Sequence, residues 1–201
     1  KKGIVDAKEL ACYISDYYEK NFHSDITPIK LQKSLYFCFA YWGGFVQKSK
    51  LPNTEITIEV NPGTVMEKKI IDYKEAGVNR LSIGLQSCND ELLKKIGRIH
   101  NFEQFLETYN IARKVGFKNI NIDLMLGLPS QSIDDLKQSL EKVIKLEPEH
   151  ISVYSLILEE GTEMFNLVEK GIIELPNEEL ERQMYWYVKN KLELAGYKHI
   201  S

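Results

Sequence analysis

The chain has 201 residues, a length that suits one large domain or a small domain joined to a larger one. Its formal net charge of −3 argues against a general nucleic-acid-binding or membrane-binding surface. The three cysteines, Cys12, Cys38 and Cys88, are odd in number and far apart, so the sequence holds neither a disulfide framework nor a CxxC metal site. We therefore expect buried thiols and a cytoplasmic protein.

The first fifty residues are expected to be helical. Residues 4–22 carry apolar side chains at helical spacing on one side, and a Thr-Pro pair predicts the start of a second helix over residues 28–46. The apolar run Leu35–Val46 is too short to cross a bilayer core of about 30 Å, so no membrane span is expected. A polar joint, QKSKLPNT, follows at residues 47–54.

Beyond this joint, predicted strands alternate with predicted helices. Four segments alternate apolar and polar side chains, as a strand does: Glu55–Asn61, Leu81–Gln86, Asn119–Ser130 and, less cleanly, Ile151–Leu156. In the third segment, Ile120 and Ile122 point to one face, and Asn121 and Asp123 point to the other. A parallel strand between two helix layers would be apolar on both faces. The pattern favours an α/β fold with a partial parallel (β/α) barrel around a polar interior, and the alternative is a doubly wound sheet.

Helix start signals separate these strands at Thr64, Asn101, Ser132 and Asn177, and a further short helix is expected over Asp90–Ile96. Thr64 and Asn101 are each followed three residues later by Glu or Gln, which is the capping-box pattern. About four βα units are therefore predicted. Right-handed crossovers would place the carboxyl ends of all four strands on one rim, where barrel enzymes carry their chemistry.

Polar residues that could bind a ligand fall on this predicted rim. They are Glu59, Asn61, Gln86 and Asp123 from the strand ends, with Arg98 and His100 from the loop GRIH. Carboxylates accept hydrogen bonds from ribose hydroxyls or an ammonium group, and an arginine pairs with a carboxylate. Together these groups suit an amino-acid nucleoside. Each residue alone could equally make a structural hydrogen bond or a surface ion pair.

Five motifs stand in the order and spacing of a known family, namely EITIEVNPGT, NRLSIGLQS, IGRIHN, INIDLMLGLP and HISVYSLILEEGT. Through them residues 51–201 resemble the radical S-adenosylmethionine (radical SAM) proteins related to oxygen-independent coproporphyrinogen III oxidase. The resemblance is strongest to the branch of heme chaperones called HemW. It implies that Glu59, Gln86, Arg98 and Asp123 contact S-adenosylmethionine. It further implies a six-stranded partial barrel, and heme or porphyrin as another ligand.

The sequence departs from this family where the family binds its iron–sulfur cluster. The family's CxxxCxxC motif, whose thiolates hold a [4Fe–4S] cluster, precedes EVNPGT, and no such spacing occurs here. Two barrel strands and the family's C-terminal domain are also expected to be absent. Without a cluster no electron reaches the sulfonium, so we expect the chain to be inactive as it stands, and whether it is an enzyme stays open. Ser130 replaces the glycine that is usual in the GLPGQ loop.

The N-terminal segment carries a second resemblance. ITPIKLQKSLYFCFAYW, within residues 3–46, is similar to the start of the Panacea domain family, the SocA-like antitoxins. That resemblance implies a protein partner for the N-terminal helices and brings no catalytic residues. The expected domains are thus 1–50, helical and Panacea-like, and 51–201, the partial radical SAM barrel. The alternatives are a non-catalytic binding or interaction module and a non-functional gene fusion.

Overall fold

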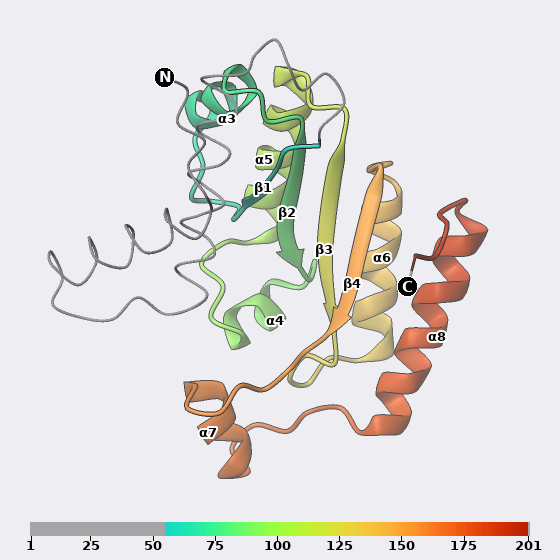
Figure 1. Cartoon of the computed structure of the whole chain (residues 1–201). Helices are drawn as coiled ribbons and strands as arrows, with labels where there is room; N and C mark the ends of the chain where they lie inside the picture. Colours follow the sequence, from blue (N-terminus) through green and yellow to red (C-terminus); the bar gives the residue numbers. More distant parts are fainter. Residues whose placement is uncertain (1–54, 201) are drawn as a thin grey trace, which may run out of the picture. The chain divides into compact units, whose positions relative to one another are not determined.

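The computed structural model describes residues 55–200 (Figure 1). Within them, residues 57–75 and 79–200 belong to one compact unit, and every described helix and strand lies in that unit. The helices predicted over 4–22 and 28–46 lie outside the described residues. Among residues 55–200, no helix has the length and apolar character of a membrane span.

The unit is built on one parallel sheet of four strands in the order β1-β2-β3-β4. The strands are β1 (Thr57–Val60), β2 (Arg80–Gln86), β3 (Ile120–Leu126) and β4 (His150–Ser155). Asp123 stands opposite Gly84 of β2 and Ser152 of β4, and Glu59 of β1 stands opposite Ser82. The four predicted strands are thereby confirmed, and so is the partial (β/α) barrel in which consecutive parallel strands are neighbours.

Helices connect the strands and cover one face of the sheet. They are α3 (Glu67–Glu75), α4 (Asp90–Lys95), α5 (Phe102–Val115), α6 (Ile133–Ile144), α7 (Glu163–Glu169) and α8 (Glu178–Leu194). In Figure 1, α5 and α6 lie behind the strands, and α3 packs on α5 while α8 packs on α6. The connection after β4 carries α7 and α8 in succession.

The apolar side chains of the strands form the core beneath these helices. Leu81, Ile83, Ile120, Ile122 and Leu124 are all fully buried. Burying a side chain of this kind stabilises the fold by about 1.5–3 kcal/mol relative to leaving it in water. A shift of one residue in register would turn all of them to the opposite face, so this burial fixes which face the polar side chains occupy.

Most helix starts follow the predicted signals. Asn101 and Gln104 form the expected capping box at α5, and Ser132 and Asn177 cap α6 and α8. The capping box predicted at Thr64 was wrong: α3 begins only at Glu67, and the Thr64 hydroxyl donates to the carbonyl of Asn61 at 2.7 Å. A threonine hydroxyl that bonds to a nearby carbonyl in a turn is no longer available as a cap. Helix α7 was not predicted.

Candidate functional site

Asn121 is the centre of a hydrogen-bond network on the polar face of the sheet. Its Nδ2 donates to Ser82 Oγ at 2.8 Å and to Asp123 Oδ1 at 2.7 Å. Its Oδ1 accepts from Ser152 Oγ at 3.0 Å and hydrogen bonds with His150 Nδ1. One buried amide thus links β2, β3 and β4 through groups that β-strand alternation turns to the same side.

Asp123 is held by this network at a fixed orientation. Ser82 Oγ donates to its Oδ2 at 2.9 Å, and Asn121 donates to its Oδ1. The side chain is only half-buried, and a carboxylate accepts up to about four hydrogen bonds. Asp123 therefore has both the exposure and the acceptor capacity to receive a ligand's hydroxyl or ammonium group, in the position that the sequence predicted.

Gln86 ends β2 in an unusual conformation. Its φ of 71° lies in the left-handed region, which a residue other than glycine seldom adopts, and only 3% of it is exposed. The Tyr154 hydroxyl donates to its Oε1 at 3.0 Å. Tyr154 was not among the predicted site residues, although the alternation in ISVYSL places it on the same face as Ser152.

The loop after α4 brings Arg98 to the end of β1. Arg98 Nη1 donates to Asn61 Oδ1 at 3.1 Å, and the backbone N–H of Arg98 donates to Leu93 O at 2.9 Å. His100, another predicted rim residue, is buried, and its Nε2 hydrogen bonds with Leu85 O at 3.2 Å. Burial is the largest influence on His100 and lowers the pKa of its imidazole. His100 therefore supports the loop as a neutral ring.

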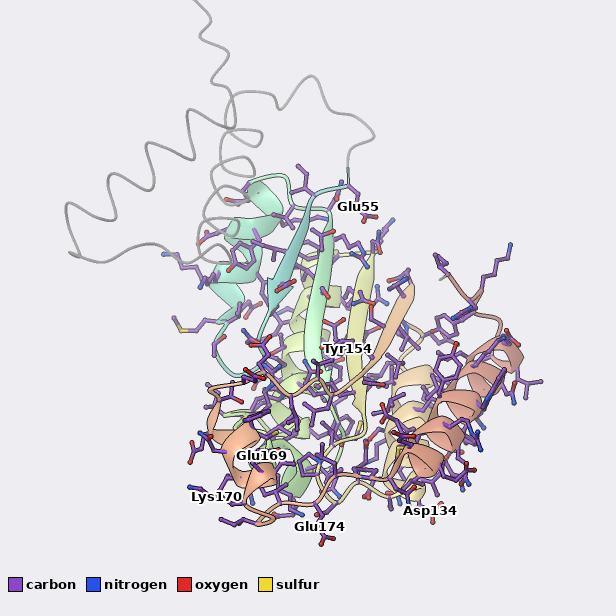
Figure 2. All side chains as sticks on the ribbon, turned by 60° about the horizontal axis from the view of Figure 1, so that its bottom comes forward. Glu55, Asp134, Tyr154, Glu169, Lys170 and Glu174 are labelled. Carbon is purple, nitrogen blue, oxygen red and sulfur yellow. The ribbon has the colours of Figure 1, made fainter. Side chains whose placement is uncertain are left out.

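The charges of three predicted site residues influence the pKa of the Tyr154 hydroxyl. Burial raises the pKa of the Tyr154 hydroxyl most, the charges of Asp123 and Glu59 raise it further, and Arg98 and the bond to Gln86 lower it. Figure 2 shows Tyr154 by the carboxyl ends of the strands, away from Asp134 on α6. Glu59 is exposed on β1, opposite Ser82 of β2. Gln86 thus contacts this half-buried phenol directly, and the charges of Asp123, Glu59 and Arg98 act on it.

A groove of about 850 Å³ lies beside this cluster, between β4 and α8. Its lining includes Tyr154, Tyr185, Val188 and Tyr197, and it does not include Glu59, Gln86, Arg98 or Asp123. The groove follows the outer edge of β4, which pairs on its other side with β3. It is thus a feature of the sheet edge, and the polar cluster lies on the face of the sheet.

Cysteine 88 does not have the chemistry of a cluster ligand. Its backbone N–H donates to Ser139 Oγ at 3.0 Å, its side chain is buried, and burial raises the pKa of its thiol to about 12. Iron–sulfur clusters are bound by thiolates, and this thiol stays protonated. Within residues 55–200, no group of three or more His, Cys, Asp or Glu side chains could hold a metal ion. The described residues therefore do not fit a [4Fe–4S] cluster.

Comparison with known proteins identifies the family. Residues 29–143 match the radical SAM superfamily. The chain is 45% identical over 143 residues to the heme chaperone HemW of Bacillus subtilis, covering 71% of this chain and 38% of that protein. It is 40% identical over 145 residues to HemW of Lactococcus lactis, covering 72% and 38%.

A solved structure agrees with these sequence matches. Coproporphyrinogen III oxidase of Escherichia coli, a radical SAM enzyme, superposes with a TM-score of 0.63 at 30% identity, over 72% of this chain and 33% of that one. This chain thus spans between 33% and 38% of the length of these relatives. The superfamily match begins at residue 29, inside the segment that also resembles Panacea, so the domain boundary at residue 50 stays a prediction. The chain belongs to the radical SAM superfamily.

Proposed function

We propose that the polar face of this sheet binds S-adenosylmethionine. The observation that carries the proposal is that Ser82 and Asn121 hold the half-exposed Asp123 carboxylate on this face, with Gln86 bonded to Tyr154 at the end of the neighbouring strand β2. Arg98 would pair with the carboxylate of the ligand, because a guanidinium matches a carboxylate in charge and geometry. Asp123 and Glu59 would accept hydrogen bonds from the ribose hydroxyls or the ammonium group, and Gln86 would contribute its carboxamide.

The proposal ends at binding and orientation of the ligand. In the family, a [4Fe–4S] cluster supplies the electron that cleaves the sulfonium. The described residues offer Cys88 alone, as a buried neutral thiol, and the sequence contains no CxxxCxxC. We therefore assign this HemW-like chain the ligand-binding rim of a radical SAM protein and no cleavage step of its own.

Titration calorimetry with S-adenosylmethionine tests this assignment. We expect measurable heat with the unaltered chain and a loss of affinity of at least about tenfold in Asp123→Ala and in Arg98→Ala, since a hydrogen bond to a charged group contributes about 1.5–3 kcal/mol. The matched controls are Asp134→Ala and Arg182→Ala, which remove exposed charges that pair with Lys137 and Glu179 on the helices.

The controls separate a local site from a general loss of charge. Asp134 lies away from Tyr154 in Figure 2, so its removal is expected to leave the affinity within about twofold of the original. Absence of heat with the unaltered, folded chain would overturn the proposal. Equal losses in Asp123→Ala and Asp134→Ala would also overturn it, because the effect would not then belong to the polar face.

A tetrapyrrole is the second candidate ligand, and exposed apolar side chains favour it. Met66, Ile99 and Ile157 lie in loops beyond the carboxyl ends of the strands and are 79%, 80% and 80% exposed. Exposed aliphatic side chains in the loops at one end of a parallel sheet are candidate contacts for an apolar ligand. Two relatives carry the name heme chaperone, which agrees with this surface.

Metal-free protoporphyrin, followed by its fluorescence, tests the apolar contact without requiring a histidine ligand. Ile99→Ser and Ile157→Ser are expected to weaken binding at least about threefold, since each removes an aliphatic contact worth about 1 kcal/mol. Leu194→Ser, at the distant end of α8 and 86% exposed, is the matched control. Equal weakening in all three variants would show non-specific adsorption.

A further inference from the structure

Gln86 occupies a strained position that its surroundings maintain. Pairing between β2 and β3 is regular as far as Gly84 and then shifts, so that Gln86 and not Leu85 stands opposite Leu124. The extra residue is a bulge, a feature that re-aims a side chain. A left-handed backbone at a residue other than glycine is strained and persists only where neighbouring groups hold it.

Glycine 84 provides the space into which the Gln86 carboxamide extends. A Cβ at position 84 would lie 3.1 Å from Gln86 Nε2 and 3.7 Å from Asn61 Oδ1. Gly84 does not have a positive φ, so the backbone does not require glycine there. The requirement is steric, because two amide side chains from neighbouring strand ends lie within 4 Å of that Cβ position.

Tyr154 determines which end of the carboxamide meets Asn61. Its hydroxyl donates to Gln86 Oε1, so the Nε2 group is the end that lies over Gly84. Asn61 Oδ1, beside that group, accepts from Arg98 Nη1 at 3.1 Å. The arrangement therefore places two donors, the Gln86 NH₂ and the Arg98 guanidinium, around one point at the ends of β1 and β2.

We propose that Tyr154 is a positioning residue that fixes the Gln86 carboxamide with its NH₂ group toward Asn61 and Arg98. The two donors form a subsite for an anionic group, and the carboxylate of the amino-acid part is the group of S-adenosylmethionine that fits it. The identity of the ligand rests on the proposed function. The effect of Tyr154 on Gln86 is a property of the chain alone and can be measured without ligand.

Side-chain amide resonances in ¹⁵N NMR test the positioning directly. We expect the Gln86 NH₂ signals of the full chain to move in Tyr154→Phe and to exchange with solvent at least about fivefold faster, the factor that corresponds to one neutral hydrogen bond of about 1 kcal/mol. Tyr197→Phe is the matched control, because it removes a hydroxyl that donates to Pro148 O at 2.8 Å. Unchanged Gln86 signals in Tyr154→Phe would overturn the positioning role.

Calorimetry with S-adenosylmethionine tests the subsite. Tyr154→Phe is expected to weaken binding about tenfold and Tyr197→Phe to leave it unchanged. If the unaltered chain gives no heat while Tyr154→Phe still moves the Gln86 signals, the proposed function fails and the positioning role stands. If the unaltered chain and Tyr154→Phe bind equally, the subsite is refuted and the proposed function stands.

A double-mutant cycle with Gly84→Ala gives an independent measurement. The new methyl group would lie 3.1 Å from Gln86 Nε2, a close contact. The carboxamide can move away from it only when Tyr154 does not hold it. We expect Gly84→Ala to shift the Gln86 signals and weaken binding several-fold more in the original background than in Tyr154→Phe. Additive effects would contradict the proposal, because residues that do not act through a common neighbour are independent.

Discussion

The two faces of the four-stranded sheet are built from alternate residues of the same strands and have opposite properties. On one face Leu81, Ile83 and Ile122 are fully buried under helices. On the other, Ser82, Asn121 and Asp123 are joined by hydrogen bonds. Adjacent residues such as Ile122 and Asp123 therefore serve different ends, the first the apolar core and the second the hydrogen-bond network to which we assign ligand binding. The polar face is also fully satisfied, since no buried side-chain N or O among residues 55–200 lacks a partner.

The largest effect is expected from the apolar face. Ile122→Ala should lower the free energy of unfolding by about 2–4 kcal/mol, because it removes a buried side chain and leaves a cavity. Denaturant titration measures this loss. Affinity for S-adenosylmethionine, measured where the variant is still folded, should change less than about twofold. A large loss of affinity in the folded variant would show that the two faces are not separable.

An intermediate effect is expected from the centre of the polar network. Asn121→Ala leaves Ser82, Ser152 and Asp123 short of a partner and should cost about 1–3 kcal/mol of stability. It should also weaken binding, because Asp123 loses one of its two restraints. Asn110→Ala, at an exposed position of α5, is the control and should be nearly neutral. A neutral Asn121→Ala would show that the network carries little free energy.

A gain in stability is expected in the loop that follows β3. Ser130 has a φ of 60°, which explains why glycine is usual at this point of the family motif. Ser130→Gly should stabilise the chain by about 0.5–1 kcal/mol. The substitution removes backbone strain, and this gain exceeds the loss from the greater conformational entropy that glycine gives the unfolded state. The midpoint of thermal unfolding measures this gain. Glu147→Gly, at a residue with a φ of 51° away from the polar face, is a second test of the same effect. A lower midpoint in Ser130→Gly would contradict this account.

The smallest effect concerns pH. Because burial holds the pKa of His100 below its ordinary 6.5, the folded state binds a proton less readily than the unfolded chain. The contribution of His100 to stability is therefore full above pH 6.5 and is lost as the pH falls through the lower, folded pKa. The melting temperatures of the unaltered chain and of His100→Gln, measured between pH 8 and pH 5, should differ less as the pH falls. A constant gap would refute the assignment.

Sequence alternation was sufficient to locate the strands and the polar face. Asp123, Glu59 and Gln86 could be placed because β-strand parity and the carboxyl ends of parallel strands are local properties of the sequence. Tyr154 could not be identified as the partner of Gln86, because their bond spans 68 positions and depends on the register of two strand pairs, β2 with β3 and β3 with β4. Helix α7 was missed because its seven residues are fewer than the roughly 11–18 over which helical periodicity is read, so its apolar residues could equally belong to a loop or a strand.

The bulge in β2 also has an evolutionary meaning. Leu85 has no partner in β3, so β2 has one residue more than β3 at this point, as it would after the insertion of one residue. An insertion or deletion of one residue earlier in β2 would exchange the apolar and polar faces of the strand residues between that change and the bulge. Related sequences should therefore differ by substitutions within β2. Differences in length should occur in the connecting loops, where a side chain's face does not depend on its position in an alternating pattern.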